Sequence, residues 1–119
     1  MKTRILFLLL LTLVINLDAA SGWKAAAAKA NITPKKNLWM AGYSSRKTAA
    51  KGKLQDLFAK ALVVEDEKGA RLAIITLDLI GVPKPLRVGV AREAQAKFKL
   101  SPSHLHINAS HTHCGPMIR

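Results

Sequence analysis

Two histidines close to the end of the chain, His111 and His113, have the residue type and the spacing best suited to chemistry. They follow an alternating apolar segment, 105–110, and precede a Gly-Pro pair. Side chains two positions apart in a strand project from the same face, so we expect both rings to leave the strand end together. Such a pair suits a metal ion, most simply zinc, or general acid–base catalysis. Two residues do not complete a zinc site, and the remaining ligands are expected from sequence that this chain does not contain.

A structural role is the alternative for this pair, with the histidines capping the strand and hydrogen-bonding to loop carbonyls. Cys114 follows directly and is the only cysteine, which excludes a disulfide within the chain. An imidazole beside it could activate the thiol as a nucleophile, or the thiolate could bind metal. As the next residue of an extended segment, however, Cys114 points to the opposite face, and we expect a small turn residue.

The elements around the histidines predict where a partner carboxylate lies. Residues 71–77 form a nearly continuous apolar strand, 86–98 have the apolar spacing of a helix, and 105–110 form another strand. A strand–helix–strand order implies parallel strands whose carboxyl ends meet at one edge of the sheet, where α/β proteins bind ligands. Asp78 ends the first of these strands. We therefore expect Asp78 beside His111 and His113, as a catalytic carboxylate or as the acceptor of a ring N–H.

The strand at 71–77 is also expected to pair with residues 58–65 as an antiparallel hairpin, because a polar turn ending in Gly69 separates them. Residues 24–30 are rich in alanine and lysine and are interpreted as a helical turn or a loose leader, with a short strand at 28–32. The predicted fold class is α/β, a mixed sheet containing a βαβ unit.

Residues 35–53 have no regular period and predict a long loop. Long loops in compact domains are often binding or lid segments, although an ordinary surface loop anchored by Trp39 and Tyr43 would show the same pattern. Gly42 is expected to permit a tight backbone or the close approach of a ligand. Arg46 is a candidate for pairing with an anionic group of a substrate. Gly42 and Arg46 are therefore the predicted substrate-binding residues.

Residues 1–22 have the layout of a secretory signal peptide, with Lys2 and Arg4 before an uncharged apolar run and small residues near 18–22. The run is shorter than the ~20 residues of a membrane span. We expect export to the periplasm or the medium and a domain covering 23–119. The net charge of +12 favours anionic partners such as lipid head groups, although scattered lysines on a solvated surface are the simpler interpretation. Export argues against nucleic acid.

Several short segments, taken together, resemble the start of the catalytic domain of neutral/alkaline non-lysosomal ceramidases. In chain order these are Asn31-Ile32-Thr33-Pro34, Met40-Ala41-Gly42-Tyr43, Gly52, Ala59-Lys60-Ala61-Leu62-Val63-Val64, Thr76-Leu77-Asp78 and His111-Thr112-His113-Cys114-Gly115-Pro116. The resemblance covers residues 28–116, and the His-Thr-His-x-Gly-Pro element is its most specific part.

This resemblance implies a partial ceramidase-type catalytic domain with Zn²⁺ as its cofactor. The activity implied is hydrolysis of the N-acyl amide of ceramide to a sphingoid base and a fatty acid, with the lipid substrate met at a membrane surface. His111 then corresponds to a zinc ligand and His113 to an active-site residue near the substrate. A further His, Glu and Tyr would complete the site from later sequence, so the 119-residue chain alone is expected to be inactive and marginally folded.

The chain departs from the family pattern at four positions. Asn31 replaces an aspartate, and Cys114 replaces a serine. Leu54 stands where the family has a histidine, and Asp56 stands where an arginine often follows. The last two lie in the substrate-facing stretch, so a different amide or an ester is an alternative substrate. A non-catalytic exported module that binds lipid or a surface is the alternative function.

Overall fold

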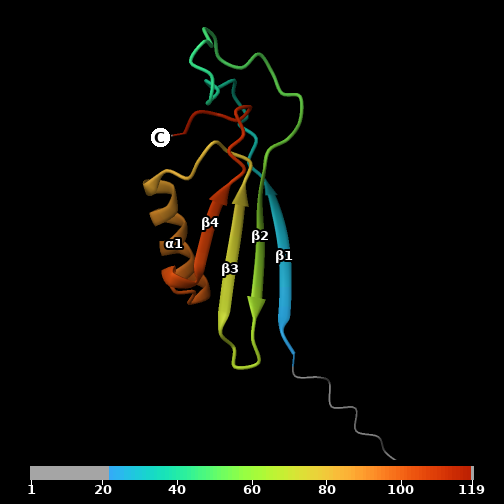
Figure 1. Ribbon diagram of the computed structural model, residues 1–119, viewed down its shortest axis with the longest axis vertical. Coiled ribbons are helices and arrows are strands. Elements are labelled where there is room, and N and C mark those ends of the chain that lie inside the picture. Colours follow the sequence, from blue (N-terminus) through green and yellow to red (C-terminus); the bar gives the residue numbers. More distant parts are fainter. Residues whose placement is uncertain (1–21, 119) are drawn as a thin grey trace, which may run out of the picture.

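A computed structural model describes residues 22–118 as one four-stranded sheet with a helix on one of its faces (Figure 1). The elements are β1 (Lys24–Asn31), β2 (Phe58–Glu65), β3 (Arg71–Leu77), α1 (Lys84–Phe98), a short 3₁₀ turn (Pro102–His104) and β4 (Leu105–Ala109). The sheet order is β1-β2-β3-β4, antiparallel except for the parallel pair β3–β4. This arrangement confirms the predicted α/β class and its βαβ unit.

The predicted signal peptide lies outside the described residues except for Gly22. Within 22–118, no helix is both long enough and apolar enough to cross a bilayer.

The β2–β3 hairpin has the predicted limits, and its turn chemistry explains why. Asp66 Oδ1 accepts hydrogen bonds from the backbone N–H groups of Lys68 (2.9 Å) and Ala70 (2.8 Å). Gly69 adopts a φ of +80°, which a residue without a Cβ reaches at little cost. The turn therefore fixes the register of the two strands, with Glu65 paired to Arg71 next to it.

β1 includes most of the short strand predicted at 28–32, but it begins at Lys24, where a helical turn or loose leader was the prediction. The whole segment is a strand whose residues pair with β2 from Lys24 opposite Glu65 to Asn31 opposite Phe58. Alanine favours helix intrinsically, but β2 offers a complete row of backbone donors and acceptors, and this tertiary pairing outweighs the local preference. Because β1 is an exposed edge strand, it has no alternating apolar pattern that would reveal it.

The core lies between α1 and one face of the sheet. Val90, Ala91 and Ala94 of the helix pack with residues of β2, β3 and β4, namely Val63, Ala73, Ile75, Leu105 and Ile107. The predicted apolar face of the helix packs on the sheet only in the middle of the helix, at Val90 and Ala94. Phe98 is 63% exposed, because the helix ends there at Lys99, which has a left-handed conformation. Leu62 and Leu72 are each 41% exposed on the other face of the sheet.

At one end of the sheet, β1, β3 and β4 end and β2 begins (Figure 1). Two irregular segments meet there, residues 32–57 between β1 and β2 and residues 110–118 after β4. Met40 and Pro116 form an isolated antiparallel bridge. Ala41 N–H donates to the Gly115 carbonyl (3.0 Å), and Met117 N–H donates to the Trp39 carbonyl (2.7 Å). This pairing holds the loop after β1 against the segment that carries His111 and His113.

Candidate functional site

The His-Thr-His segment is a turn that begins where β4 ends. The strand stops at Ala109, and the following residues hydrogen-bond to the chain leaving β3, through Ser110 N–H to the Leu77 carbonyl (2.9 Å) and Thr112 N–H to the Leu79 carbonyl (3.2 Å). His111 has a φ of +58°, which interrupts the strand period. The expected placement of both rings on one strand face is therefore wrong. The turn itself brings the two ring centroids to 5.3 Å, at an interplanar angle of 64°.

The His111 ring is oriented by a backbone carbonyl. Its Nδ1 lies 2.7 Å from the carbonyl oxygen of Ile80, in the connection between β3 and α1. A carbonyl oxygen only accepts, so Nδ1 carries the proton, and in the neutral ring Nε2 keeps its lone pair. A metal-binding histidine is commonly held in this way by a carbonyl or carboxylate on its other nitrogen. The ring is exposed, so Nε2 can serve as a ligand.

Asp78 reaches the same end of the sheet but turns its side chain toward β2. Its Oδ2 accepts the Phe58 N–H at 2.9 Å, and its Oδ1 lies 3.5 Å from Lys60 Nζ. Asp78 was expected to accept a hydrogen bond from a histidine N–H, but at His111 the backbone carbonyl of Ile80 is the acceptor. The backbone of Asp78 therefore lies at the same sheet end as the histidines, as predicted, but its carboxylate faces β2 and not the histidines. The carboxylate extends the β2–β3 pairing by one residue, through its bond to Phe58.

His113 packs directly on Gly42. Gly42 adopts a φ of +99°, and a Cβ built on it would lie 2.5 Å from His113 Cβ and 2.7 Å from its Nδ1. Such distances are far below van der Waals contact, so only glycine fits. The Tyr43 ring meets the His113 ring edge-to-face, with centroids 5.1 Å apart. The close approach predicted for Gly42 is thus made by a side chain of the protein itself.

Arg46 approaches His113 from the same loop. Its Nη2 donates to the His113 carbonyl oxygen at 2.9 Å, and its Cζ lies 5.0 Å from the centroid of the Tyr43 ring. Its Nη1 is buried without a hydrogen-bond partner among the described residues. The guanidinium contacts seen here are with protein groups, and binding of a substrate anion by Arg46 stays a prediction.

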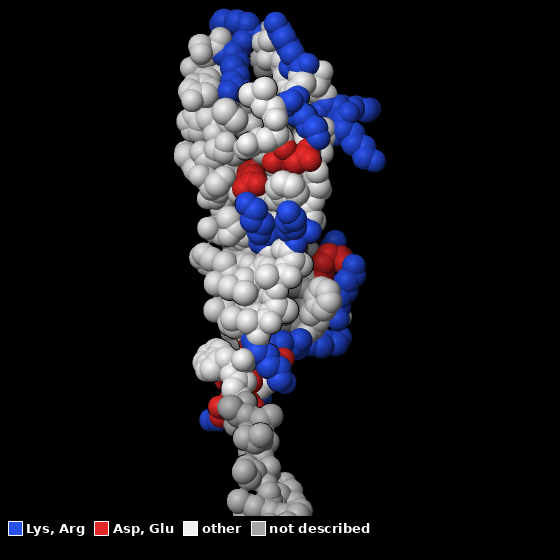
Figure 2. All heavy atoms as spheres, turned by 90° about the vertical axis from the view of Figure 1, so that its right-hand side faces the viewer, with Lys and Arg blue, Asp and Glu red and all other residues white. Residues whose placement is uncertain are grey.

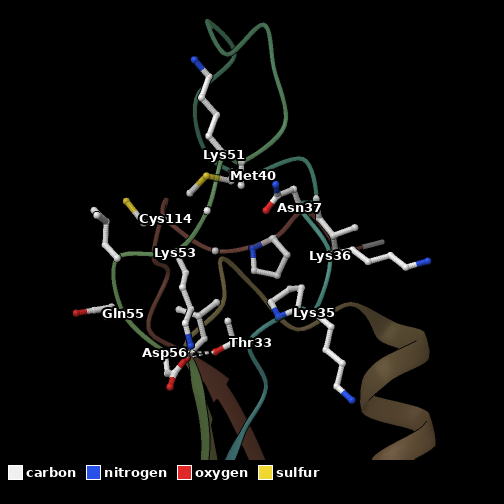
Figure 3. A pocket seen from close by; sticks show the side chains of 18 of the residues that line it. Thr33, Lys35, Lys36, Asn37, Met40, Lys51, Lys53, Gln55, Asp56 and Cys114 are labelled. Atoms are coloured by element: carbon white, nitrogen blue, oxygen red, sulfur yellow. Dashed lines mark hydrogen bonds and ion pairs between the residues drawn. The ribbon is translucent and has the colours of Figure 1, made fainter.

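Cys114 borders a groove of about 1020 Å³ between the two irregular segments (Figure 3). Its thiol is free and its N–H donates to Thr112 Oγ1 at 3.2 Å. Four lysines border the groove, Lys35, Lys36, Lys51 and Lys53, together with Met40. Figure 3 shows Lys35 and Lys36 pointing outward and Lys53 turning to Asp56. Neither His111 nor His113 lines the groove, so it adjoins the histidine pair without enclosing it.

Asp56 anchors the far end of the loop to the sheet. The ion-paired hydrogen bond from Lys53 is the main reason that the pKa of Asp56 lies below its ordinary value of 3.8, with a smaller contribution from Thr33. Thr33 Oγ1 donates to Asp56 Oδ1 (3.1 Å) and accepts the Leu57 N–H (2.8 Å). Leu54, at the family's histidine position, is fully exposed.

Sequence reasoning missed two partners of the histidines. The Ile80 carbonyl leaves no signal in the sequence, because every residue has a backbone carbonyl. Tyr43 is predicted only as an anchor, in the alternative of an ordinary surface loop, and its place beside Gly42 is the one sequence signal that points toward the site. Within residues 22–118, no group of three or more histidine, cysteine or acidic side chains could hold a metal ion. A metal site that included His111 would therefore need ligands from outside residues 22–118.

Comparison with known proteins finds one family in both sequence and structure. Residues 23–117 match the family described as neutral/alkaline non-lysosomal ceramidase, N-terminal. Neutral ceramidases of Drosophila pseudoobscura pseudoobscura and Drosophila melanogaster are each 32% identical, over 82% and 79% of this chain. The crystal structure of neutral ceramidase from Pseudomonas aeruginosa superposes with a TM-score of 0.75 at 28% identity, over 81% of this chain.

A second solved structure, a ceramidase complexed with C2, gives a TM-score of 0.70 at 28% identity. The chain spans only a small part of these relatives, 14% of each Drosophila protein and 16% of each solved chain. The family match, residues 23–117, nevertheless covers the four strands, the helix and the His-Thr-His turn. The chain belongs to the neutral/alkaline non-lysosomal ceramidase family.

Proposed function

We propose that this chain forms part of the active site of an exported, zinc-dependent amidohydrolase that cleaves the N-acyl amide of ceramide or of a related lipid. Membership of the family supports a hydrolase of the ceramidase type. The observation that best supports a metal role is the Ile80 carbonyl bond to Nδ1 of His111, which leaves Nε2 as the free donor. The further ligands, a His, a Glu and a Tyr, would come from sequence outside this chain.

A zinc ion bound there would polarise the amide carbonyl and lower the pKa of a bound water. His111 would supply one neutral nitrogen ligand in a fixed orientation. His113, with its ring centroid 5.3 Å from that of His111, would contact the substrate or move a proton at the scissile amide. Asp78 is assigned to holding the sheet end, since its oxygens are already engaged by Phe58 and Lys60.

We propose that the loop end of the molecule faces the lipid surface on which the substrate lies. Lys and Arg side chains are prominent at this end of the molecule (Figure 2), and four lysines border the groove beside Cys114. Cationic side chains near an anionic membrane surface each contribute ~1 kcal/mol of attraction. The same lysines also favour the second candidate function, a non-catalytic module that binds an anionic surface.

The test is zinc content and fatty-acid release from an N-acyl sphingosine, measured on the complete protein. We expect about one zinc per chain, and we expect His111→Ala to lose that zinc and at least ~1000-fold of the activity. His106→Ala is the matched control, because it removes a histidine from β4 away from the turn. Retention of zinc and activity by His111→Ala would contradict the proposal. Vesicle binding without zinc or hydrolysis would support the binding module instead.

A further inference from the structure

Three residues of the loop after β1 surround His113, and they do so from different directions. Gly42 lies against the imidazole, Tyr43 meets the ring edge-to-face, and Arg46 bonds to the backbone carbonyl. The three come from five consecutive positions of the chain, yet they are more than sixty residues away from His113 in sequence. Together they fix both the backbone and the side chain of a residue that lies in a turn with no regular secondary structure.

The contacts form a continuous stack. The Tyr43 ring lies 5.0 Å from the Arg46 guanidinium carbon and 5.1 Å from the His113 ring centroid. The guanidinium is thus attracted to the tyrosine ring while its Nη2 reaches past to the His113 carbonyl. Arg46 is half-buried and Tyr43 is 54% exposed. An exposed aromatic ring gains little by burial here, so its orientation is set by the arginine and the histidine.

We infer that Arg46 and Tyr43 are positioning residues that hold His113 in its reactive place beside His111. The Arg46 bond fixes the carbonyl of His113, and the Tyr43 ring limits rotation of the imidazole. The catalytic consequence rests on the proposed function, whereas the positioning itself does not. Arg46 acts through His113 in this account, in contrast to the sequence-based expectation that it binds a substrate anion.

The isolated thiol next to His113 offers a direct measurement of this positioning. Cys114 is exposed and is the only cysteine of the chain, so a nitroxide attached to it reports how tightly the turn is held. The complete protein is used, with any cysteine outside this chain replaced by serine. Arg46→Ala should shorten the rotational correlation time of the label at least ~2-fold, because the turn loses the charge-assisted hydrogen bond that ties the His113 carbonyl to the loop.

Matched variants separate positioning from charge and from folding. Lys47→Ala removes an equal charge from the same loop, and Lys47 has no hydrogen bond or ion pair within the described residues; its label should behave as in the parent protein. Arg46→Lys keeps a cation and one donor and should restore part of the lost order. Tyr43→Phe keeps the ring and should leave the mobility of the label as in the parent protein, whereas Tyr43→Ala should increase it.

Turnover of a lipid amide gives the second measurement. A positioning role predicts that Arg46→Ala lowers kcat by ~10- to 100-fold with KM nearly unchanged, because misplacing a reacting group impairs the chemical step. Unchanged label mobility in Arg46→Ala, or a raised KM with unchanged kcat, would overturn the inference, and the latter would assign Arg46 to the substrate. A loosened turn in a protein that hydrolyses no amide would uphold the positioning and refute the proposed function.

Discussion

His111 and His113 are two positions apart, yet different parts of the molecule hold them. His111 is fixed from within the βαβ unit, by the carbonyl of Ile80 in the β3–α1 connection. His113 is fixed from the loop after β1, by Gly42, Tyr43 and Arg46. The position of His111 is therefore tied to the βαβ unit, whereas the position of His113 depends on a separate loop.

His111 and His113 differ in how sensitive their positions are to substitution of their neighbours. The Ile80 contact uses a backbone carbonyl, which survives most substitutions at that position. The contacts to His113 use one glycine and two specific side chains, so single substitutions in the loop can displace it. We therefore expect substitutions in the loop to displace His113 while His111 keeps its orientation and, under the proposed function, its zinc.

Gly42→Ala should have the largest effect, because it displaces His113 and leaves the contact that holds His111 unchanged. The new Cβ would overlap the imidazole, and the backbone would keep an unfavourable positive φ, at a combined cost of about 2–4 kcal/mol. We expect a loss of activity of ~100-fold or more, with zinc content nearly unchanged, because His111 is held elsewhere. Metal analysis and turnover on the same preparation measure both effects.

Gly69→Ala is the control for backbone strain. Gly69 has a similar φ of +80° in the β2–β3 turn, and no atom lies within 4 Å of a Cβ built there. It should lose ~1–2 kcal/mol of stability from the backbone alone and keep its activity. Equal losses of activity in the two variants would show that strain, and not displacement of His113, is responsible.

The sequence predicted the fold best where the signal was local. The limits of β2 and β3 follow from apolar strands around a polar turn, and α1 and β4 are predicted to within two residues. β1 was predicted only in part, as a short strand at 28–32, because its alanines contain little strand signal and its paired residues in β2 lie 27 to 41 positions further on. Pairing over that distance is a property of the folded chain.

The site was predicted in part for a similar reason. The nearness of His111 and His113 was expected from strand alternation, but it comes from a turn that begins at a left-handed residue. The direction of the Asp78 side chain depends on Phe58 and Lys60 of a different strand, which no spacing rule reveals. Residue types thus indicated which residues lie close together, and tertiary contacts decided which groups each side chain faces.

Asp78→Ala should have a moderate effect, on stability rather than on chemistry. The variant leaves the partly buried Phe58 N–H without its acceptor, which costs about 1–2 kcal/mol. We expect a lower midpoint of denaturant unfolding and a change in kcat of less than ~3-fold in the folded protein. Asp78→Asn retains an oxygen acceptor and should recover most of the stability. A large fall in kcat at native stability would instead restore the catalytic role predicted from the sequence.

Asp56→Asn should have the smallest effect, and its size should depend on pH. The pKa of Asp56 is lowered in the folded protein, chiefly by its hydrogen bond from Lys53. A lowered pKa means that the carboxylate stabilises the fold fully above its ordinary value of 3.8 and loses that contribution as the pH falls through the lowered value. The stability difference between the parent and Asp56→Asn should therefore shrink over that acidic range.

The Lys53–Asp56 pair anchors the loop that holds His113, so removing it tests whether a weak, distant contact of the loop contributes to stability. Lys53→Gln removes the same interaction from the other side, and the double variant should be no less stable than the worse single one. Because the pair is exposed, added salt should reduce its effect. Strictly additive losses would show that the two residues act separately, and a loss that grows as the pH falls would contradict the assigned direction of the pKa shift.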